Sequence, residues 1–173
     1  MKTLIFYSSL FFLTSCVTEK KDNAIDSLST VTAEEENINL VLDSWHRDAA
    51  QANGPAYFEA ISEGGIFIGT DATENWEKED FKKWSQPYFN RGKAWNFTSI
   101  DRNVYFSSEL DFAWFDELLS TQMKMCRGSG VLEKEHGKWK IKHYVLSMTI
   151  PNEIVDSVVS LKSSIEDSVL ALY

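Results

Sequence analysis

The chain is poor in cysteine, with two in 173 residues. Cys16 lies near the N-terminus, at the end of an expected signal peptide, where it is expected to be modified. Cys126 then remains a free thiol without a partner for an internal disulfide. The fold must therefore depend on a hydrophobic core. A content of 43% hydrophobic and 13% aromatic residues is enough for one compact domain of ordinary size.

Patterns that hold metals or phosphates are also lacking. His46, His136 and His143 form no short ligand cluster, and Cys126 has no partner at metal-binding spacing. No glycine-rich loop that could cradle a phosphate occurs, and Gly128-Ser129-Gly130 lies within an expected strand rather than at a strand-to-helix turn. No metal and no cofactor is therefore expected.

Basic residues are in the minority. The chain has 17 lysines and arginines against 26 acids, a net charge of −9, and no segment concentrates the basic side chains. This negative field repels polyanions, so we expect neither a nucleic-acid partner nor attraction to an anionic lipid surface.

The first 15 residues, MKTLIFYSSLFFLTS, have the features of a signal peptide. One charge, at Lys2, precedes an apolar stretch too short to cross a bilayer as a helix. Leu13-Thr14-Ser15-Cys16 resembles the bacterial lipobox, which predicts an exported lipoprotein of the cell envelope, anchored in the membrane through a lipid on Cys16. The alternative is an ordinary cleavage site beside an unrelated cysteine. Residues 16–33 are polar and aperiodic, and are expected to form a flexible tether.

Three helical segments are expected from hydrophobic periodicity. Apolar residues recur at three- and four-residue steps from residue 34 to 53, before the stop Asn53-Gly54-Pro55. A short helical segment at 56–61 precedes a strand at 66–69. Residues 152–172 form a terminal amphipathic helix, whose apolar stripe must cover either its own sheet or a second subunit.

The stretch GTDATENWEKEDFKKW, residues 69–84, allows two interpretations. Asp71 and Glu74 could perform chemistry, or they could cap a helix, since they have the spacing of a capping box. The capping interpretation is favoured, and the helix after it, ended by residues 87–92, carries Trp76, Phe81, Trp84 and Tyr88 partly on one face.

The sequence after Gly92 has the composition of β-strands. Four long runs rich in aromatic and β-branched residues, at 95–106, 110–121, 123–135 and 138–150, are joined by short polar links. They predict an antiparallel meander. Helices followed by a curved antiparallel sheet indicate the α+β class.

Alternation along the last strand suggests which side chains face inward. Lys140 and Lys142 share one parity and belong outside, which places Trp139, Ile141 and His143 on the inner face. A histidine on an apolar face is more often a hydrogen-bonded core residue than a catalyst, but His143 is the best candidate for proton transfer.

The two preceding strands are less clear. Arg127 is expected inward, where it could hold a carboxylate of a ligand or of Asp116 or Asp71, although an ion pair at the strand end is an equal alternative. An acid occurs in each parity class of residues 112–117, and Trp114 with Asp116 is preferred as the inward pair over Phe115 with Glu117.

Aromatic residues exceed what a minimal core needs. Two explanations are weighted equally: these rings pack the core, or they line a ligand pocket. The predicted pocket comprises Phe67, Trp84, Trp95, Phe97, Trp114, Arg127, Trp139, Ile141 and His143.

The order of elements and the segments YFEAISEGGIFIGTDATENW, AWFDELL, RGSGVL and WKIKHYVLSMTIPNE resemble the SnoaL-like branch of the nuclear transport factor 2 and ketosteroid isomerase superfamily, over residues 34–153. The resemblance implies a cone-shaped curved sheet wrapped around helices, with a hydrophobic pocket at one end, where Asp71 and Glu74 shape the mouth and cap the helix. Members include isomerases, dehydratases, cyclases and proteins without catalytic activity, so the fold does not decide function.

Three hypotheses follow. The first is a lipid-anchored module that binds a small, largely apolar molecule in the cone. The second is a cyclase- or isomerase-type enzyme in which His143 or Asp116 removes a proton and Arg127 stabilises the enolate. The third is an interaction domain that forms a homodimer.

Overall fold

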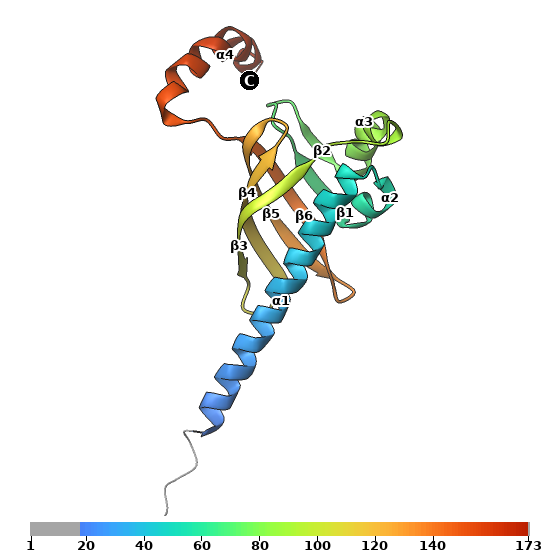
Figure 1. The fold of residues 1–173 in the computed structure, drawn as a ribbon, viewed down its shortest axis with the longest axis vertical. Helices are drawn as coiled ribbons and strands as arrows, with labels where there is room; N and C mark the ends of the chain where they lie inside the picture. The colour runs from blue at the N-terminus through green and yellow to red at the C-terminus, as the bar shows by residue number, and fades with distance from the viewer. Residues whose placement is uncertain (1–17, 173) are drawn as a thin grey trace, which may run out of the picture.

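The computed structural model describes the backbone of residues 18–172 and the side chains of residues 28–172 (Figure 1). The expected signal peptide and Cys16 lie outside these residues, so lipid anchoring stays a prediction. The prediction of a lipid anchor would be wrong if the Cys16→Ser variant remained in the membrane fraction.

The long helix α1 (Thr18–Ala50) begins well before the helix expected at residue 34. The segment predicted to be a flexible tether is therefore helical from Thr18 on. In Figure 1 this part of α1 extends beyond the sheet, and Leu28 is 67% exposed. Residues 16–33 show no apolar period, so the pattern that identifies core-facing helices could not reveal this part of α1.

Two short helices and two strands follow α1. They are α2 (Gly54–Glu59), with Pro55 in its first turn, β1 (Ile61–Ile68), β2 (Asn75–Glu77) and α3 (Lys78–Asn90). The strand β2 was not predicted. It separates the turn at Asp71 from α3, whose N-cap residue is Glu77 and carries no side-chain cap.

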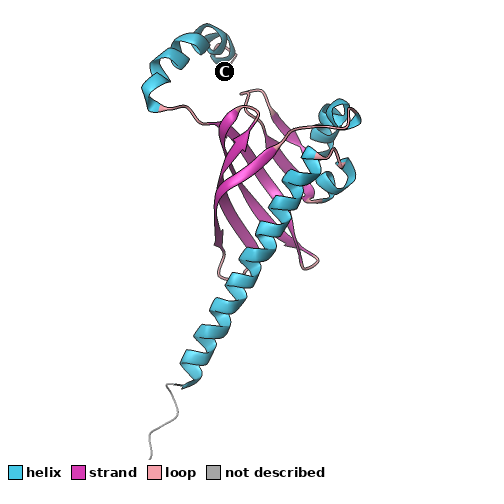
Figure 2. Cartoon of the chain, in the orientation of Figure 1, coloured by secondary structure: helices cyan, strands magenta, loops and turns pink. Residues whose placement is uncertain are grey.

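The predicted meander is confirmed. It consists of β3 (Phe97–Phe106), β4 (Phe112–Thr121), β5 (Lys124–Glu135) and β6 (Lys138–Met148), each antiparallel to the next. The strand order is β2-β1-β6-β5-β4-β3, because β1 pairs in parallel with β6. Figure 2 shows one curved sheet with α1 lying across its concave face.

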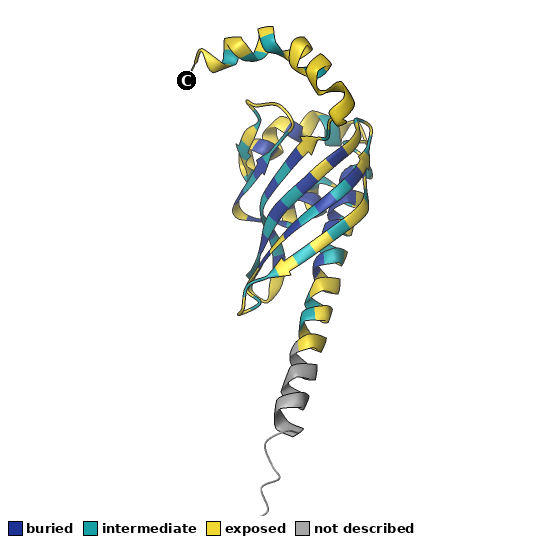
Figure 3. Ribbon diagram, turned by 90° about the vertical axis from the view of Figure 1, so that its left-hand side faces the viewer, coloured by how far each residue is buried: buried dark blue, intermediate teal, exposed yellow. Residues whose placement is uncertain are grey.

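The core lies between the sheet and helices α1 to α3. Trp45 of α1 stacks on Tyr57 of α2 with ring centroids 4.9 Å apart, and meets Tyr144 of β6 edge-on at 4.7 Å. All three rings are almost completely buried. Burial of a large apolar side chain contributes about 1.5–3 kcal/mol, so the aromatic surplus is used largely to fill the cone. Figure 3 shows buried residues alternating with more exposed ones along the strands of the sheet.

The inward parity of β4 and β5 is opposite to the one predicted. Glu117 is fully buried, whereas Trp114 is 49% exposed. The side chain of Arg127 is 52% exposed and pairs at 3.0 Å with Asp116 on the convex face. The orientation expected for Trp114, Asp116 and Arg127 is therefore wrong.

Two glycines explain why this parity is required. A Cβ atom at Gly128 would collide with the hydroxyl of Tyr144, and one at Gly130 with the backbone carbonyl of His143 and the ring of Phe115. The concave face of β5 is thus the crowded one, and a glycine there lets neighbouring rings approach the backbone.

The predicted inward orientation of His143 is also wrong, because β6 contains a bulge. Ile141 pairs with Leu132 and His143 with Val131, so Lys142 is an additional residue. A bulge moves every following side chain to the opposite face. Ile141 and Tyr144 are therefore buried, whereas His143 lies on the convex face beside Val131 and Ile66.

The chain ends with a short 3-10 turn, η1 (Asn152–Ile154), and helix α4 (Val155–Leu170), which confirms the predicted terminal helix. No residue within α4 is buried, and Leu161 and Ile165 are 78% and 69% exposed. In Figure 1, α4 and the beginning of α1 lie at opposite ends of the molecule. Within the described part of the chain, no helix is both long and apolar enough to cross a membrane.

Candidate functional site

A pocket lined by aromatic rings opens at the end of the cone nearest α3. Its cavity is about 150 Å³ in volume. We call it the ring pocket and define it by its six aromatic residues: Phe67, Trp76, Phe81, Trp84, Trp95 and Phe97. Phe67 and Phe81 stack with centroids 4.0 Å apart, and Trp76 and Trp84 with centroids 4.6 Å apart.

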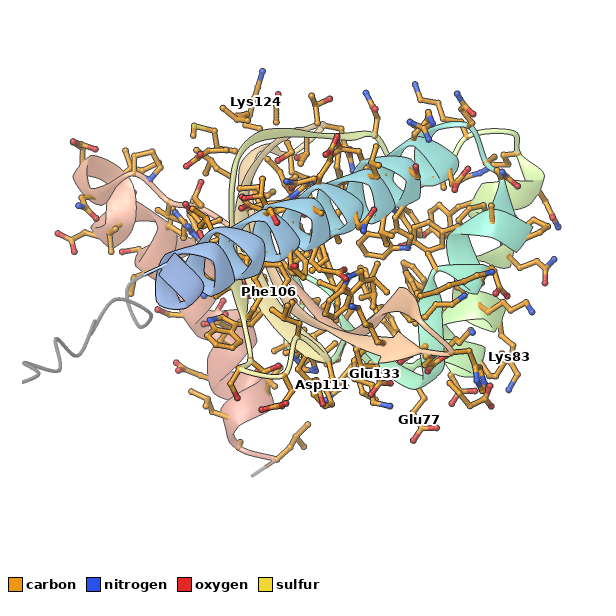
Figure 4. The ribbon with its side chains drawn as sticks, turned by 90° about the horizontal axis from the view of Figure 1, so that it is seen from below. Glu77, Lys83, Phe106, Asp111, Lys124 and Glu133 are labelled. Atoms are coloured by element: carbon orange, nitrogen blue, oxygen red, sulfur yellow. The ribbon has the colours of Figure 1, made fainter. Side chains whose placement is uncertain are left out.

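Local sequence places these rings together. The helix α3 turns Phe81 into the core, where it is fully buried. Lys83 of α3 and Glu77 at the end of β2 point outward (Figure 4). The pairing of Phe67 with Trp76 brings β1 and β2 side by side, so that both rings face α3.

The GTDATEN stretch forms one rim of this pocket. Asp71 accepts a hydrogen bond from the Thr73 backbone N–H at 2.9 Å, and Glu74 Oε2 accepts one from the Asp71 backbone N–H at 3.2 Å. The bond to Glu74 is one half of a capping box, whereas the Asp71 side chain accepts from Thr73 instead of from the Glu74 backbone, and both bonds close the turn between β1 and β2 rather than cap α3. Predicting them as a helix cap was therefore wrong, although Glu74 does line the ring pocket.

A second group of side chains, which we call the ionic cluster, lies deeper in the cone and reaches the surface at Asp43, whose side chain is 58% exposed. It comprises Asn39, Asp43 and His46 of α1, Arg102 of β3, Glu117 of β4 and Tyr144 of β6. His46 Nε2 lies 2.8 Å from Glu117 Oε1, and Arg102 donates to Glu117 Oε2 from Nε at 3.0 Å and from Nη2 at 2.8 Å.

The remaining members complete the network around Arg102 and Glu117. Arg102 Nη2 lies 2.9 Å from Asp43 Oδ1, and its Nη1 donates to Asn39 Oδ1 at 3.0 Å. The Tyr144 hydroxyl donates to Glu117 Oε1 at 3.2 Å. The cluster thus ties α1 to three strands of the sheet.

The surroundings keep Glu117 ionised. Burial alone would raise its pKa, but the hydrogen bond and charge of His46, together with those of Arg102, outweigh burial and hold the pKa below the ordinary value of 4.5. Burial and the Glu117 charge raise the pKa of Tyr144 well above 10, so its hydroxyl keeps the proton that it donates.

The ring pocket and the ionic cluster are adjacent. Phe97 lines the ring pocket, and its ring centroid lies 5.8 Å from that of His46. Phe67 likewise lies 5.6 Å from Tyr144 between ring centroids. An apolar ligand in the pocket would therefore be separated from a buried, charged network by single aromatic rings.

The predicted pocket residues are divided among several places. Phe67, Trp84, Trp95 and Phe97 meet in the ring pocket. Ile141 is a core residue, 1% exposed. Trp139 lines a different groove between α1 and the β5–β6 turn, where its Nε1 donates to Glu34 Oε2 at 2.7 Å. Trp114, Arg127 and His143 lie on the convex face.

Sequence reasoning missed the ionic cluster. Glu117 was considered as an inward residue but ranked second, because an acid is present in each parity class. His46 gave a usable signal: it follows Trp45 and shares the buried side of α1 with Leu42 and Ala49. Nothing local marks Arg102. Among the described residues, no group of three or more histidine, cysteine, aspartate or glutamate side chains could hold a metal ion.

Comparison with protein families identifies a matching model, the SnoaL-like domain, over residues 38–151. This range is more than half of the chain and lies within the segment 34–153 that carried the resemblance. A comparison with curated proteins finds no match.

Solved structures share the fold at low sequence identity. An NTF2-like protein of unknown function from Pseudomonas putida has a TM-score of 0.60 at 14% identity, covering 70% of this chain and 91% of that one. A candidate scytalone dehydratase from Novosphingobium aromaticivorans has a TM-score of 0.61 at 14% identity, covering 71% and 89%. The association domain of CaMKII from C. elegans has a TM-score of 0.56 at 17% identity, covering 68% and 97%. At these identities the similarity concerns the fold alone.

Proposed function

The chain belongs to the SnoaL-like domain family, and we propose that it binds a small, largely apolar molecule in the ring pocket. The observation that carries this proposal is the concentration of six aromatic side chains around one open cavity. Ligand sites are typically concave and apolar, with a few polar groups that fix orientation. Here Thr70, Glu74 and Gln122 supply those groups.

The size of the pocket limits what it accepts. A cavity of about 150 Å³ is large enough for a molecule the size of benzene. A single aromatic or cyclic group therefore fits, packed against the rings that line the cavity. Because the chain carries a net charge of −9, neutral groups are favoured over anions.

Substituting Trp84 tests the proposal. Trp84 is 41% exposed, so Trp84→Ala is expected to spare the fold while lowering the affinity for 2-phenylethanol about tenfold through lost apolar contact. Isothermal titration calorimetry measures this change. Trp114→Ala is the matched control, because Trp114 is 49% exposed but lies on the convex face. Equal effects of the two variants, or no binding by the unsubstituted protein, would refute the proposal.

The second candidate function is self-association through the convex face. Tyr105 and Trp114, 45% and 49% exposed, stack there with centroids 5.9 Å apart. The paired positions Val131, His143 and Ile66 continue this row across the sheet. An exposed apolar row of this kind is typical of an interaction surface. The association domain of CaMKII shares the fold, which supports a homodimer as this alternative.

Light scattering tests self-association. We expect Trp114→Glu to reduce the molar mass in solution from that of a dimer to that of a monomer, because it places a charge in the apolar row. Trp84→Glu serves as the control and should leave the molar mass unchanged. A monomeric unsubstituted protein at every concentration would exclude this function.

The enzyme hypothesis built on His143 or Asp116 gains no support from their positions. Both residues lie on the convex face, and Asp116 is engaged by Arg127 at 3.0 Å. Neither side chain lines the ring pocket, so neither can transfer a proton to a ligand bound there.

A further inference from the structure

The chain contains a larger hollow between α4 and the end of the sheet. We call it the α4 groove; its volume is about 680 Å³. The sheet contributes Ile68, Val145, Leu146 and Met148, the segment after β6 contributes Ile150, and α4 with the turn before it contributes Ile154, Val158, Lys162 and Glu166. A groove of this volume lies in the range typical of small-molecule sites.

The α4 groove adjoins the ring pocket, and the two hollows share part of their lining. Gly69, Thr70, Glu74 and Leu146 line both. Glu74 stands at the junction, with its carboxylate held against Gly69 by the hydrogen bond from the Asp71 backbone. A molecule could therefore extend from one hollow into the other past this side chain.

The lining favours an uncharged, apolar occupant. Apolar side chains at the end of the sheet line the groove together with Ile154 and Val158, and its charged residues are Asp71, Glu74, Glu166 and Lys162. The Lys162 ammonium is already paired with Glu166 at 2.7 Å. The remaining carboxylates, in a chain of net charge −9, oppose an anionic group.

The helix α4 forms one wall of this space through Val158, Lys162 and Glu166. An isolated helix of 16 residues is marginal in water, and helices normally gain stability by burying an apolar face. Within α4 every residue stays at least partly exposed. Val158 of α4 and Ile154 of the preceding turn face the groove, whereas Leu161 and Ile165 do not line it. A bound apolar chain would bury Ile154 and Val158.

We propose that the two hollows form one binding site for a neutral, elongated molecule whose compact cyclic end occupies the ring pocket and whose apolar chain lies beneath α4. This inference rests on the proposed function of the ring pocket. It extends that function from a small cyclic ligand to a lipid-like class of molecules, and it gives α4 the role of covering the chain.

Two probes separate the two halves of the site. The short probe, 2-phenylethanol, reaches only the ring pocket, whereas 6-phenylhexan-1-ol adds four methylene groups that can enter the α4 groove. Burial of each methylene strengthens binding about fourfold. We therefore expect the long probe to bind the full-length protein at least about tenfold more tightly than the short one, as measured by calorimetry.

Paired substitutions locate the added contact. Val158→Ser is expected to weaken the long probe about fivefold and to leave the short probe unchanged, because Val158 lines the groove. Val159→Ser is its control. Val159 is the next residue of α4, is 52% exposed and does not line the groove. On the sheet side, Met148→Ser should weaken the long probe as Val158→Ser does, because Met148 lines the groove. Its control is Met125→Ser, which should have no effect, because Met125 is 49% exposed and does not line the groove. Far-UV circular dichroism verifies that each variant keeps its helices.

The outcomes distinguish this inference from the function on which it rests. Equal affinities for the two probes, with Trp84→Ala weakening both, would overturn the role of the α4 groove and leave the ring pocket standing. Equal effects of Val158→Ser and Val159→Ser, together with no effect of Met148→Ser, would overturn it as well. Binding of neither probe would contradict both proposals.

Discussion

Replacing Glu117 by alanine is expected to lower the free energy of unfolding by about 3–5 kcal/mol, the loss that follows when one partner of a buried ion pair is removed. Glu117 is fully buried and receives hydrogen bonds from Arg102 and Tyr144, besides its contact with His46. Its removal leaves the guanidinium and the imidazole inside the cone with their main partner missing. Urea denaturation followed by tryptophan fluorescence measures the change.

The adjacent residue provides a matched control. Asp116 also belongs to an ion pair, with Arg127 at 3.0 Å, but its side chain is 34% exposed and that of Arg127 is 52% exposed. Surface pairs contribute about 0–1 kcal/mol, so Asp116→Ala should change stability little. If the two alanine variants lost similar stability, the buried cluster would not have the structural role that we assign to it.

Stability should also fall in acid because of Glu117. Its pKa is lowered in the folded protein, so the carboxylate contributes stability that is fully present above its unfolded value, near 4.5. Protonation of the folded form removes this contribution as the pH falls through the lowered pKa. The window of loss therefore opens below about pH 4.5 and extends downward.

Comparison with Glu117→Gln isolates this contribution, since Glu34, Glu59 and Asp71 also have lowered pKa values and are shared by both proteins. The difference in unfolding free energy between the unsubstituted protein and Glu117→Gln should be constant above pH 5 and shrink below about pH 4.5. A difference independent of pH down to pH 2 would show that Glu117 is not the ionised centre of the cluster.

The ionic cluster also bears on ligand binding. It fixes α1 to β3, β4 and β6 through Arg102, Glu117 and Tyr144, and its neighbours Phe67 and Phe97 form a wall of the ring pocket. The buried network thus holds the position of the pocket wall. Aromatic packing fills much of the rest of the cone, and the ligand that we propose lies at its mouth and under α4.

Periodicity along the chain was enough to predict most of the architecture. The apolar steps around Trp45 predicted the packed part of α1, and the four aromatic, β-branched runs predicted β3 to β6 in their observed order. The steps through Ile154, Val158 and Leu161 predicted α4. These patterns are local, because a helix or strand that faces a core must repeat its apolar residues at its own period.

Four of the nine predicted pocket residues, Phe67, Trp84, Trp95 and Phe97, do meet around one cavity. Their identity as surplus rings was visible in the sequence. Their meeting depended on β2, a strand of three residues, and on α3 folding back over β1. Such a short strand carries no period that a sequence pattern could reveal.

The sequence by itself determined the fold class, the meander and the aromatic character of the interior, because each follows from repeats within single segments. Only the tertiary structure decided which face of each strand is the inner one. A bulge at Lys142 sends His143 outward, and the crowding of Tyr144 against Gly128 turns Arg127 toward solvent. Alternation along a strand predicts that neighbouring side chains point to opposite faces of the sheet, but not which face is buried. Contacts between segments distant in the sequence decide the buried face, and they place Glu117 and His46 inside the protein.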